Sequence, residues 1–220
     1  MIRRLIHYIR FLKKVSVFQF FYLNYFCKSI IRIDSSKIIP YKNTVIDISR
    51  SARIYLGDGD IEIGCNLLKK SKTETRVRLR ENAIWSSVGG CQISYGSTLE
   101  ILSDAIFDSG YFTMNSNSVI VVGNKVVFGK DIMVARNVTI LDSDFHIILY
   151  EEKNRENKDG IKIDNHVWIG ANSTILKNVR VGSGVVISAN TIVTKDIEKN
   201  TLIGNNRIQQ VLRHNVYWER

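Results

Sequence analysis

A histidine and an aspartate stand where a regular pattern in this sequence is interrupted. The pattern calls for a small apolar residue at position 144 and an aliphatic residue at position 146, but the chain has Asp144 and His146. Histidine titrates near neutral pH, so it can remove the proton of a hydroxyl group, which is otherwise a poor nucleophile. A carboxylate beside it, Asp144 or else Asp142, can fix the imidazole tautomer and stabilise the imidazolium. These residues predict a general base at His146 paired with Asp144; a solvated histidine at a frayed end of the repeat is the alternative.

The interrupted pattern has a period of six residues. Its apolar positions form two runs, Val122, Phe128, Val134 and Ile140, then Ile163, Ile169, Ile175, Val181, Ile187 and Val193. A helix repeats every 3.6 residues and a strand every two, so neither alone explains this spacing. A coil with three short strands per turn does explain it, with successive turns about 4.8 Å apart. The sequence therefore predicts an all-β fold, a parallel β-helix.

The chain divides into three parts around this coil. Residues 34–200 are expected to form the β-helix, with a charged loop, 147–160, leaving it directly after His146. Residues 1–33 are amphipathic and then aromatic, and residues 201–220 form a short C-terminal tail. Thirteen residues separate Lys14 from Lys28, which is too short for a membrane span. We expect residues 1–33 to be a helical and aromatic cap over the first coil, with contact to a membrane surface as the alternative or an additional role.

Charge and composition narrow the choice of partners. The formal net charge is +10, and residues 1–50 hold ten Lys and Arg against two acids. A second basic segment contains Lys69, Lys70, Lys72, Arg76, Arg78 and Arg80. No nucleic-acid-binding motif accompanies these charges, so we expect anionic small molecules, acidic glycans or a membrane surface rather than nucleic acid. Three cysteines without paired spacing and four scattered histidines predict a reduced, cytoplasmic protein with no metal site.

Three stretches of the sequence carry a family resemblance. They are Asp142 to His146, Asn165 to Asn172 with its tryptophan, and Ile187 to Asp196 with its Thr-Lys-Asp ending. Together they resemble the hexapeptide-repeat acyltransferases, which include galactoside, maltose and surface-polysaccharide O-acetyltransferases. The resemblance implies a left-handed parallel β-helix, a homotrimer, and acyl transfer from acetyl-coenzyme A bound between neighbouring subunits. The first 110 residues match this family weakly or not at all.

The same resemblance implies roles for further residues. Positions that correspond to coenzyme A contacts in the family are Trp168, Ala171, Ala189, Thr194, Lys195 and Arg213. Asn115 corresponds to an asparagine that binds the acceptor sugar. His146 corresponds to the catalytic base, and the resemblance implies no metal.

The predicted function is acetyl-CoA-dependent O-acetylation of a sugar or a surface-polysaccharide precursor. We expect the protein to work in the cytoplasm, and also expect it at the inner face of the membrane. Two alternatives remain open. The same scaffold supports N-acetylation of an amino sugar, for which a base at His146 matters less because a free amine is already nucleophilic. A non-catalytic β-helix module would not need His146, Trp168 and Lys195 together.

Overall fold

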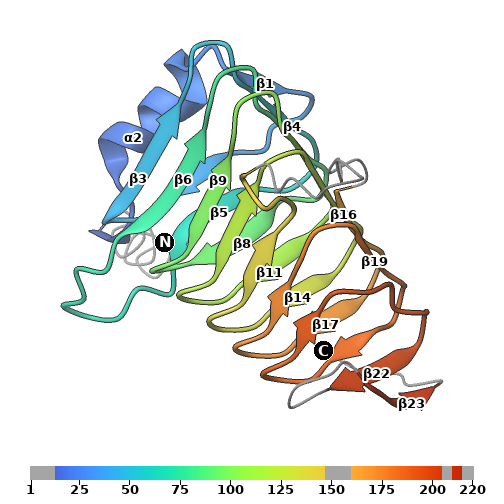
Figure 1. The fold of residues 1–220 in the computed structure, drawn as a ribbon. Coiled ribbons are helices and arrows are strands. Elements are labelled where there is room, and N and C mark those ends of the chain that lie inside the picture. Colours follow the sequence, from blue (N-terminus) through green and yellow to red (C-terminus); the bar gives the residue numbers. More distant parts are fainter. Residues whose placement is uncertain (1–12, 147–159, 205–209, 215–220) are drawn as a thin grey trace.

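The chain winds into a triangular coil whose three walls are parallel β-sheets (Figure 1). The computed structural model describes residues 13–146, residues 160–204 and the backbone of residues 210–214. Up to β21, successive strands go to the first, second and third sheet in turn, so each sheet receives every third strand; β22 and β23 then both join the second sheet. The fold is the predicted left-handed parallel β-helix.

The sheets are named after their first strands. The β1 sheet contains β1 (Ile30–Arg32), β4 (Arg53–Leu56), β7 (Ile84–Ser87), β10 (Ile106–Ser109), β13 (Lys125–Phe128), β16 (Ile161–Ile163) and β19 (Val179–Val181). The β2 sheet contains β2 (Ile38–Pro40), β5 (Ile61–Cys65), β8 (Cys91–Ser94), β11 (Phe112–Met114), β14 (Ile132–Val134), β17 (Val167–Ile169), β20 (Val186–Ile187), β22 (Thr201–Gly204) and the antiparallel β23 (Gln210–His214). The β3 sheet contains β3 (Thr44–Ile48), β6 (Thr75–Leu79), β9 (Thr98–Ile101), β12 (Val119–Val122), β15 (Thr139–Leu141), β18 (Thr174–Ile175) and β21 (Ile192–Val193).

The core lies inside the coil, where the apolar residues of the six-residue repeat meet. Every residue of the two predicted runs is buried, from Val122 to Ile140 and from Ile163 to Val193. Because alternate side chains of a strand point to the same face, as in β16, β17 and β19 where both end residues are buried, the repeat fixes which face of each short strand is apolar. In the middle coils, rings fill the interior: Phe107, Phe112 and Phe128 pack edge to face, and Trp85 stacks on Phe107.

Asparagine sets the tight corners between the β2 and β3 sheets. We call this line of turns the β2–β3 edge. Asn117, Asn137, Asn172 and Asn190 lie on it in four successive coils, all with φ between 56° and 62°. Asparagine tolerates this left-handed conformation better than most residues with a side chain. The repeat therefore encodes the corner as well as the core.

Two short helices lie at the N-terminal end of the coil (Figure 1). They are α2 (Val17–Phe21) and the π-helix η1 (Tyr22–Phe26), and Leu23 is buried in the core. The side chain of Asn24 donates to the carbonyl of Ile38 at 2.7 Å and accepts from its N–H at 3.0 Å. Asn24 thus satisfies backbone groups at the outer edge of β2 that no strand pairs.

The extent of the predicted cap, residues 1–33, stays a prediction, because residues 1–12 lie outside the described parts of the chain. No helix in those described parts is both long and apolar enough to cross a bilayer.

Candidate functional site

The predicted acidic residues differ in their surroundings. They follow β15 where the chain passes from the β3 sheet towards the β1 sheet, which we call the β3–β1 edge. Asp142 is fully buried and accepts hydrogen bonds from the N–H groups of Gly123 and Asn124, at 2.5 and 2.9 Å. These backbone groups belong to the preceding coil, so Asp142 joins two coils. Its carboxylate is a structural contact.

Asp144 and His146 are both exposed, so neither occupies a core position. The core pattern ends at Asp142, and the chain leaves the coil from there. The carboxylate of Asp144 pairs with the ammonium of Lys177. Within the described residues, no hydrogen bond joins Asp144 to His146, the pair that the sequence predicts. His146 is exposed at the edge of the coil, after the last residue of β15.

Lys177 is a residue that the sequence argument missed. It follows Ile175 by two positions, as Asp142 follows Ile140 and Lys195 follows Val193. Since Ile175 and Val193 pair in the β3 sheet, Lys177 and Lys195 occupy equivalent positions one coil apart. The six-residue repeat could have identified Lys177 as a neighbour of this site.

Thr194 and Lys195 lie on the β3–β1 edge, directly after β21. Both are exposed, and Val193 before them is buried. A hydroxyl and an ammonium at an exposed corner can bind phosphate oxygens.

The other predicted contacts lie elsewhere on the coil. Asn115, Ala171 and Ala189 belong to the β2–β3 edge, and Asn115 and Ala189 are exposed there. The indole of Trp168 lies on the outer face of the β2 sheet with 41% of its surface exposed. Arg213 lies on β23, where its backbone pairs with Leu202. In one copy of the chain, the β3 sheet separates His146 and Lys195 from Ala171 and Ala189.

His166 has the acidic partner that His146 lacks. Its Nδ1 atom lies 2.7 Å from an oxygen of Asp131, at the corner between the β1 and β2 sheets. Both residues have left-handed backbone conformations, with φ of 56° and 61°. His166 therefore lies in a turn and not in a strand, and its ring contacts the Asp131 carboxylate. In the described ranges, no three His, Cys, Asp or Glu side chains gather into a group that could hold a metal.

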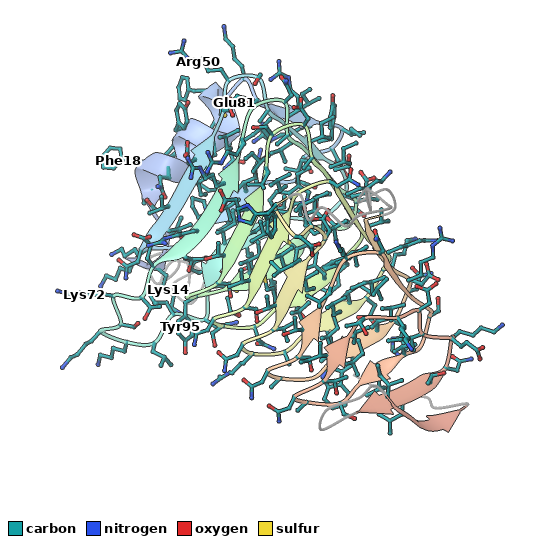
Figure 2. The ribbon with its side chains drawn as sticks, in the orientation of Figure 1. Lys14, Phe18, Arg50, Lys72, Glu81 and Tyr95 are labelled. Carbon is teal, nitrogen blue, oxygen red and sulfur yellow. The ribbon has the colours of Figure 1, made fainter. Side chains whose placement is uncertain are left out.

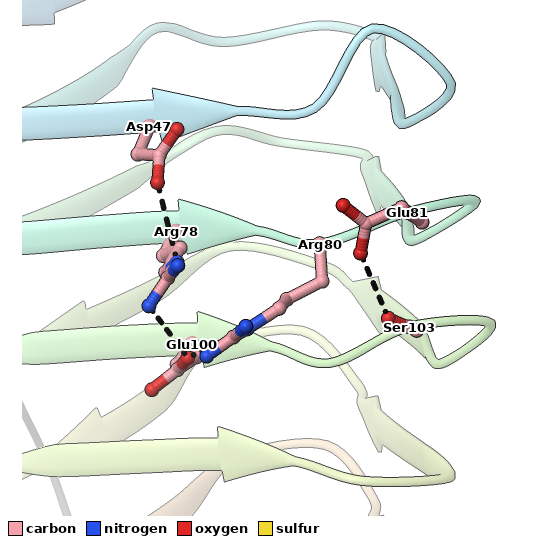
Figure 3. A network of polar contacts seen from close by, with 6 residues as sticks. All are labelled: Asp47, Arg78, Arg80, Glu81, Glu100 and Ser103. Atoms are coloured by element: carbon pink, nitrogen blue, oxygen red, sulfur yellow. Dashed lines mark hydrogen bonds and ion pairs between the residues drawn. The ribbon is translucent and has the colours of Figure 1, made fainter.

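The second basic segment divides into two halves. Its arginines are paired with acids: Arg76 with Glu74, and Arg78 with Asp47 at 3.2 Å and Glu100 at 3.7 Å. Arg80 shares Glu100 at 3.3 Å. Figure 3 shows the contacts of Arg78 and Arg80 with Asp47 and Glu100 across neighbouring strands of the β3 sheet.

Beside this network, the carboxylate of Glu81 accepts a hydrogen bond from the hydroxyl of Ser103 at 3.1 Å. The backbone amide of Glu81, and after it the hydroxyl of Ser103, lower the pKa of the Glu81 carboxyl. The β3 sheet thus balances its arginines locally. The lysines of the segment, Lys69, Lys70 and Lys72, lie in the loop between β5 and β6 and take no part in the network.

Comparisons with known proteins agree with this geometry. Residues 160–195 match the family model described as bacterial transferase hexapeptide (six repeats). The galactoside O-acetyltransferase of Escherichia coli K12 is 38% identical over 111 residues, which cover 50% of this chain and 51% of that protein. The enzyme of the same description from Lactococcus lactis IL1403 is 31% identical over 120 residues, covering 54% and 51%. The chain thus spans about half the length of these curated relatives.

Two solved structures resemble the chain over most of its length. The polysialic acid O-acetyltransferase OatWY is 25% identical with a TM-score of 0.57, covering 87% of this chain and 90% of that one. The polySia-specific acetyltransferase NeuO, at 24% identity and a TM-score of 0.52, shares the fold and covers 87% and 89%. The repeat, the coil that it forms and these relatives together confirm the resemblance to the hexapeptide-repeat acyltransferases, galactoside and polysaccharide O-acetyltransferases among them.

Proposed function

We propose that this protein is an O-acetyltransferase that moves an acetyl group from acetyl-coenzyme A to a hydroxyl of a sugar or surface-polysaccharide precursor. The observation that carries this proposal is the likeness to a polysialic acid O-acetyltransferase over 87% of the chain, with His146 exposed where the coil is interrupted. The galactoside O-acetyltransferases among the relatives support a sugar hydroxyl as the acceptor.

The residues on the two edges fit the proposed donor chemically. Lys195 and Thr194 can bind phosphate oxygens, and Arg213 is proposed to assist them. Trp168 offers an exposed apolar face to an alkyl chain, while Ala171 and Ala189 are small enough to leave their backbone atoms accessible. Acetyl-coenzyme A supplies the thioester carbonyl that the acceptor oxygen attacks.

His146 performs the proton transfers in the proposed reaction. It accepts the proton of the acceptor hydroxyl as the new carbon–oxygen bond forms. As the carbon–sulfur bond breaks, the imidazolium returns this proton to the departing sulfur, so the products are the acetyl ester and the free thiol. Asn115 is proposed to hold the acceptor. Asp144 is proposed to leave its pair with Lys177 and to stabilise the imidazolium of His146.

The test compares two histidines. We expect His146→Ala to lower kcat by about 100-fold or more, the size of effect that a lost general base produces. His166→Ala is the matched control, because it removes a histidine whose ring is held by Asp131 at another corner. Coenzyme A release is measured with nucleotide sugars, lipid-linked glycans and free sugars as acceptors.

The outcome also separates the O- and N-acetyltransferase functions. Near-wild-type turnover of His146→Ala with its best acceptor contradicts the assignment of the base. If the only productive acceptor is an amino sugar, N-acetylation replaces the proposal. If no acceptor releases coenzyme A and the donor does not bind, the chain is a non-catalytic β-helix.

We also propose that the protein works in the cytoplasm and touches the inner face of the membrane through its N-terminal part. The exposed aromatic side chains of α2 and η1 support this contact, Phe18 with 91% and Phe26 with 72% of its surface exposed. Aromatic and basic side chains together favour the bilayer interface. Cosedimentation of Phe18→Ser and wild type with anionic vesicles tests it, and equal binding would contradict it.

A further inference from the structure

A basic cleft lies at the N-terminal part of the β2–β3 edge. Its volume is about 490 Å³, and the lysines in its wall come from three separate segments of the chain. These are the residues before α2, the turn between β2 and β3, and the loop between β5 and β6; β5 and β8 complete the wall with Glu62, Cys65 and Gln92. Six lysines line it: Lys13, Lys14, Lys42, Lys69, Lys70 and Lys72. Figure 2 shows Lys14 and Lys72 at this edge, with Tyr95 of the next coil nearby.

Backbone pairing brings the first two segments together. Val15 forms an antiparallel bridge with Tyr41, and the N–H of Lys42 donates to the carbonyl of Lys14 at 2.9 Å. The N–H of Ser16 donates to the carbonyl of Pro40 at 2.8 Å. Lys14 and Lys42 are therefore held side by side by the fold.

The third segment is an enlarged corner. Residues 66–74 connect β5 to β6, whereas residues 95–97 suffice in the next coil. The side chain of Asn43 donates to the carbonyl of Ser71 at 3.1 Å and ties the loop to the turn after β2. This tie joins the loop that carries Lys69, Lys70 and Lys72 to the turn that carries Lys42.

The six positive charges lack compensating acids. Within the described residues, none of these lysines forms an ion pair, in contrast to Arg76 and Arg78 on β6 and Arg80 directly after it. The one acid in the cleft wall is Glu62, and its two oxygens accept hydrogen bonds from Tyr41 at 2.6 Å and Gln92 at 3.0 Å. Burial, followed by the bond to Glu62, raises the pKa of Tyr41, so the phenol stays protonated and donates. Like charges gathered in a cleft attract anions and favour their binding.

The cleft lies on the same edge of the coil as part of the proposed active site. Four strand spacings separate β5 from β17 in the β2 sheet, a distance of about 19 Å at the usual spacing. Asn115, the proposed acceptor contact, lies on this edge between them, directly after β11. An acceptor that reaches from the cleft to the transfer site must therefore be longer than one sugar.

We propose that the six-lysine cleft binds anionic groups, carboxylates or phosphates, of an extended acidic glycan, whose hydroxyl is acetylated further along the β2–β3 edge where a neighbouring copy of the chain supplies its His146. This proposal rests on the proposed function. The acceptor is then a polyanionic glycan of several sugars. Its charged groups lie in the cleft, and its reacting hydroxyl lies about 19 Å away. A small neutral sugar would not reach the cleft.

Binding without a donor tests the cleft independently of catalysis. The test uses two triple variants. The loop variant carries Lys69→Gln, Lys70→Gln and Lys72→Gln. The control variant carries Lys162→Gln, Arg180→Gln and Lys199→Gln, which remove three exposed charges elsewhere. Calorimetry with sialic acid oligomers tests a carboxylate ligand, inorganic pyrophosphate tests a phosphate ligand, and maltoheptaose is the neutral control. We expect at least one anion to bind, at least tenfold more weakly to the loop variant, while the control variant binds like wild type. Added salt should weaken this binding.

Turnover and vesicle binding complete the test. With an acidic oligosaccharide acceptor, the loop variant should have a higher KM than wild type, with the same kcat and melting temperature. With a short neutral acceptor, the two proteins should have the same KM. Equal anion affinity in both variants, or no anion binding by wild type, overturns the proposal. Lysine-dependent binding to phosphatidylglycerol vesicles without binding of either soluble anion also overturns it, because the cleft would then be a membrane contact. Anion binding by a protein that transfers no acetyl group would instead refute the proposed function and leave the cleft assigned.

Discussion

The carboxylate of Asp144 is paired with the ammonium of Lys177. In this structure the tautomer of His146 is therefore not fixed by Asp144. The pair with Lys177 holds the segment that carries His146 against the next coil. An exposed histidine can still act as a base, because its pKa range suits that role without a triad. Asp144 then contributes to the reaction only by stabilising the imidazolium of His146 after it forms.

Lys195 gives a prediction at the same scale. Its side chain is exposed after the last buried residue of the repeat, so replacing it should change stability by no more than about 0.5 kcal/mol. If it binds a phosphate of coenzyme A, a charge-assisted contact of about 1.5–3 kcal/mol is lost in Lys195→Ala. Coenzyme A affinity should then fall roughly ten- to a hundredfold, with an almost unchanged melting temperature. Titration calorimetry and thermal unfolding measure the two quantities.

A shortened donor provides the control for Lys195. An acetyl-pantetheine thioester lacks the nucleotide phosphates, so Lys195→Ala should affect its use much less. Lys199→Ala removes another exposed lysine nearby and should leave both donors unaffected. An equal loss with both donors, or a large fall in melting temperature, would mean that Lys195 does not bind the nucleotide.

The corner after β15 is joined to the corner after β12 through Asp142. Asp142 accepts hydrogen bonds from two backbone N–H groups of the corner after β12, one coil earlier. Asp144, two residues later, makes a partly exposed ion pair. Buried hydrogen bonds and exposed ion pairs contribute very differently to stability.

We therefore expect Asp142→Ala to destabilise the protein by roughly 2–4 kcal/mol, because two partly buried donors lose their acceptor. Asp144→Ala should cost no more than about 1 kcal/mol, the usual upper value for an exposed ion pair. Urea unfolding of both variants measures the difference. Equal losses would show that Asp142 is not the contact that holds the two coils together.

The repeat explains why so much of the coil could be predicted. One apolar residue in every six specifies the inward face of each strand, and this information is local to the sequence. The pairing of Asp144 with Lys177 depends on which exposed side chains meet across coils, and the repeat shows only their shared positions. The basic cleft could not be predicted, because its lysines come from segments that lie together only after the N-terminal residues pair with the turn after β2. Sequence order gave Lys69 to Arg80 as one basic segment, whereas the fold separates its lysines from its arginines.

At the scale of the whole molecule, the proposed site residues lie on both sides of the β3 sheet. His146 and Lys195 belong to the β3–β1 edge, while Ala171 and Ala189 belong to the β2–β3 edge. Exposed apolar side chains accompany both, Ile192 on the β3 sheet with 52% and Trp168 on the β2 sheet with 41% of its surface exposed. A neighbouring copy that docks one edge against the other brings the two sets together. Three copies around an axis close such a head-to-tail contact into a ring.

We expect the active species to be a homotrimer with a site shared between neighbours. Light scattering on the purified protein should give three times the mass of the chain. A mixing experiment then tests the sharing directly: His146→Ala and Trp168→Ala are each nearly inactive alone, and they are denatured, mixed equally and refolded together. In a ring where each site takes His146 from one copy and Trp168 from the next, about a quarter of the sites regain both residues.

The mixture distinguishes the two arrangements, because a site built within one copy cannot recover. If all residues of the site come from one chain, the mixed sample keeps only the average of the two inactive variants. An active monomer in light scattering would exclude the shared site as well. Recovery of about a quarter of wild-type activity requires both that the copies exchange and that the two edges meet across a subunit boundary. It would therefore explain why one chain carries His146 on one side of the β3 sheet and Trp168, Ala171 and Ala189 on the other.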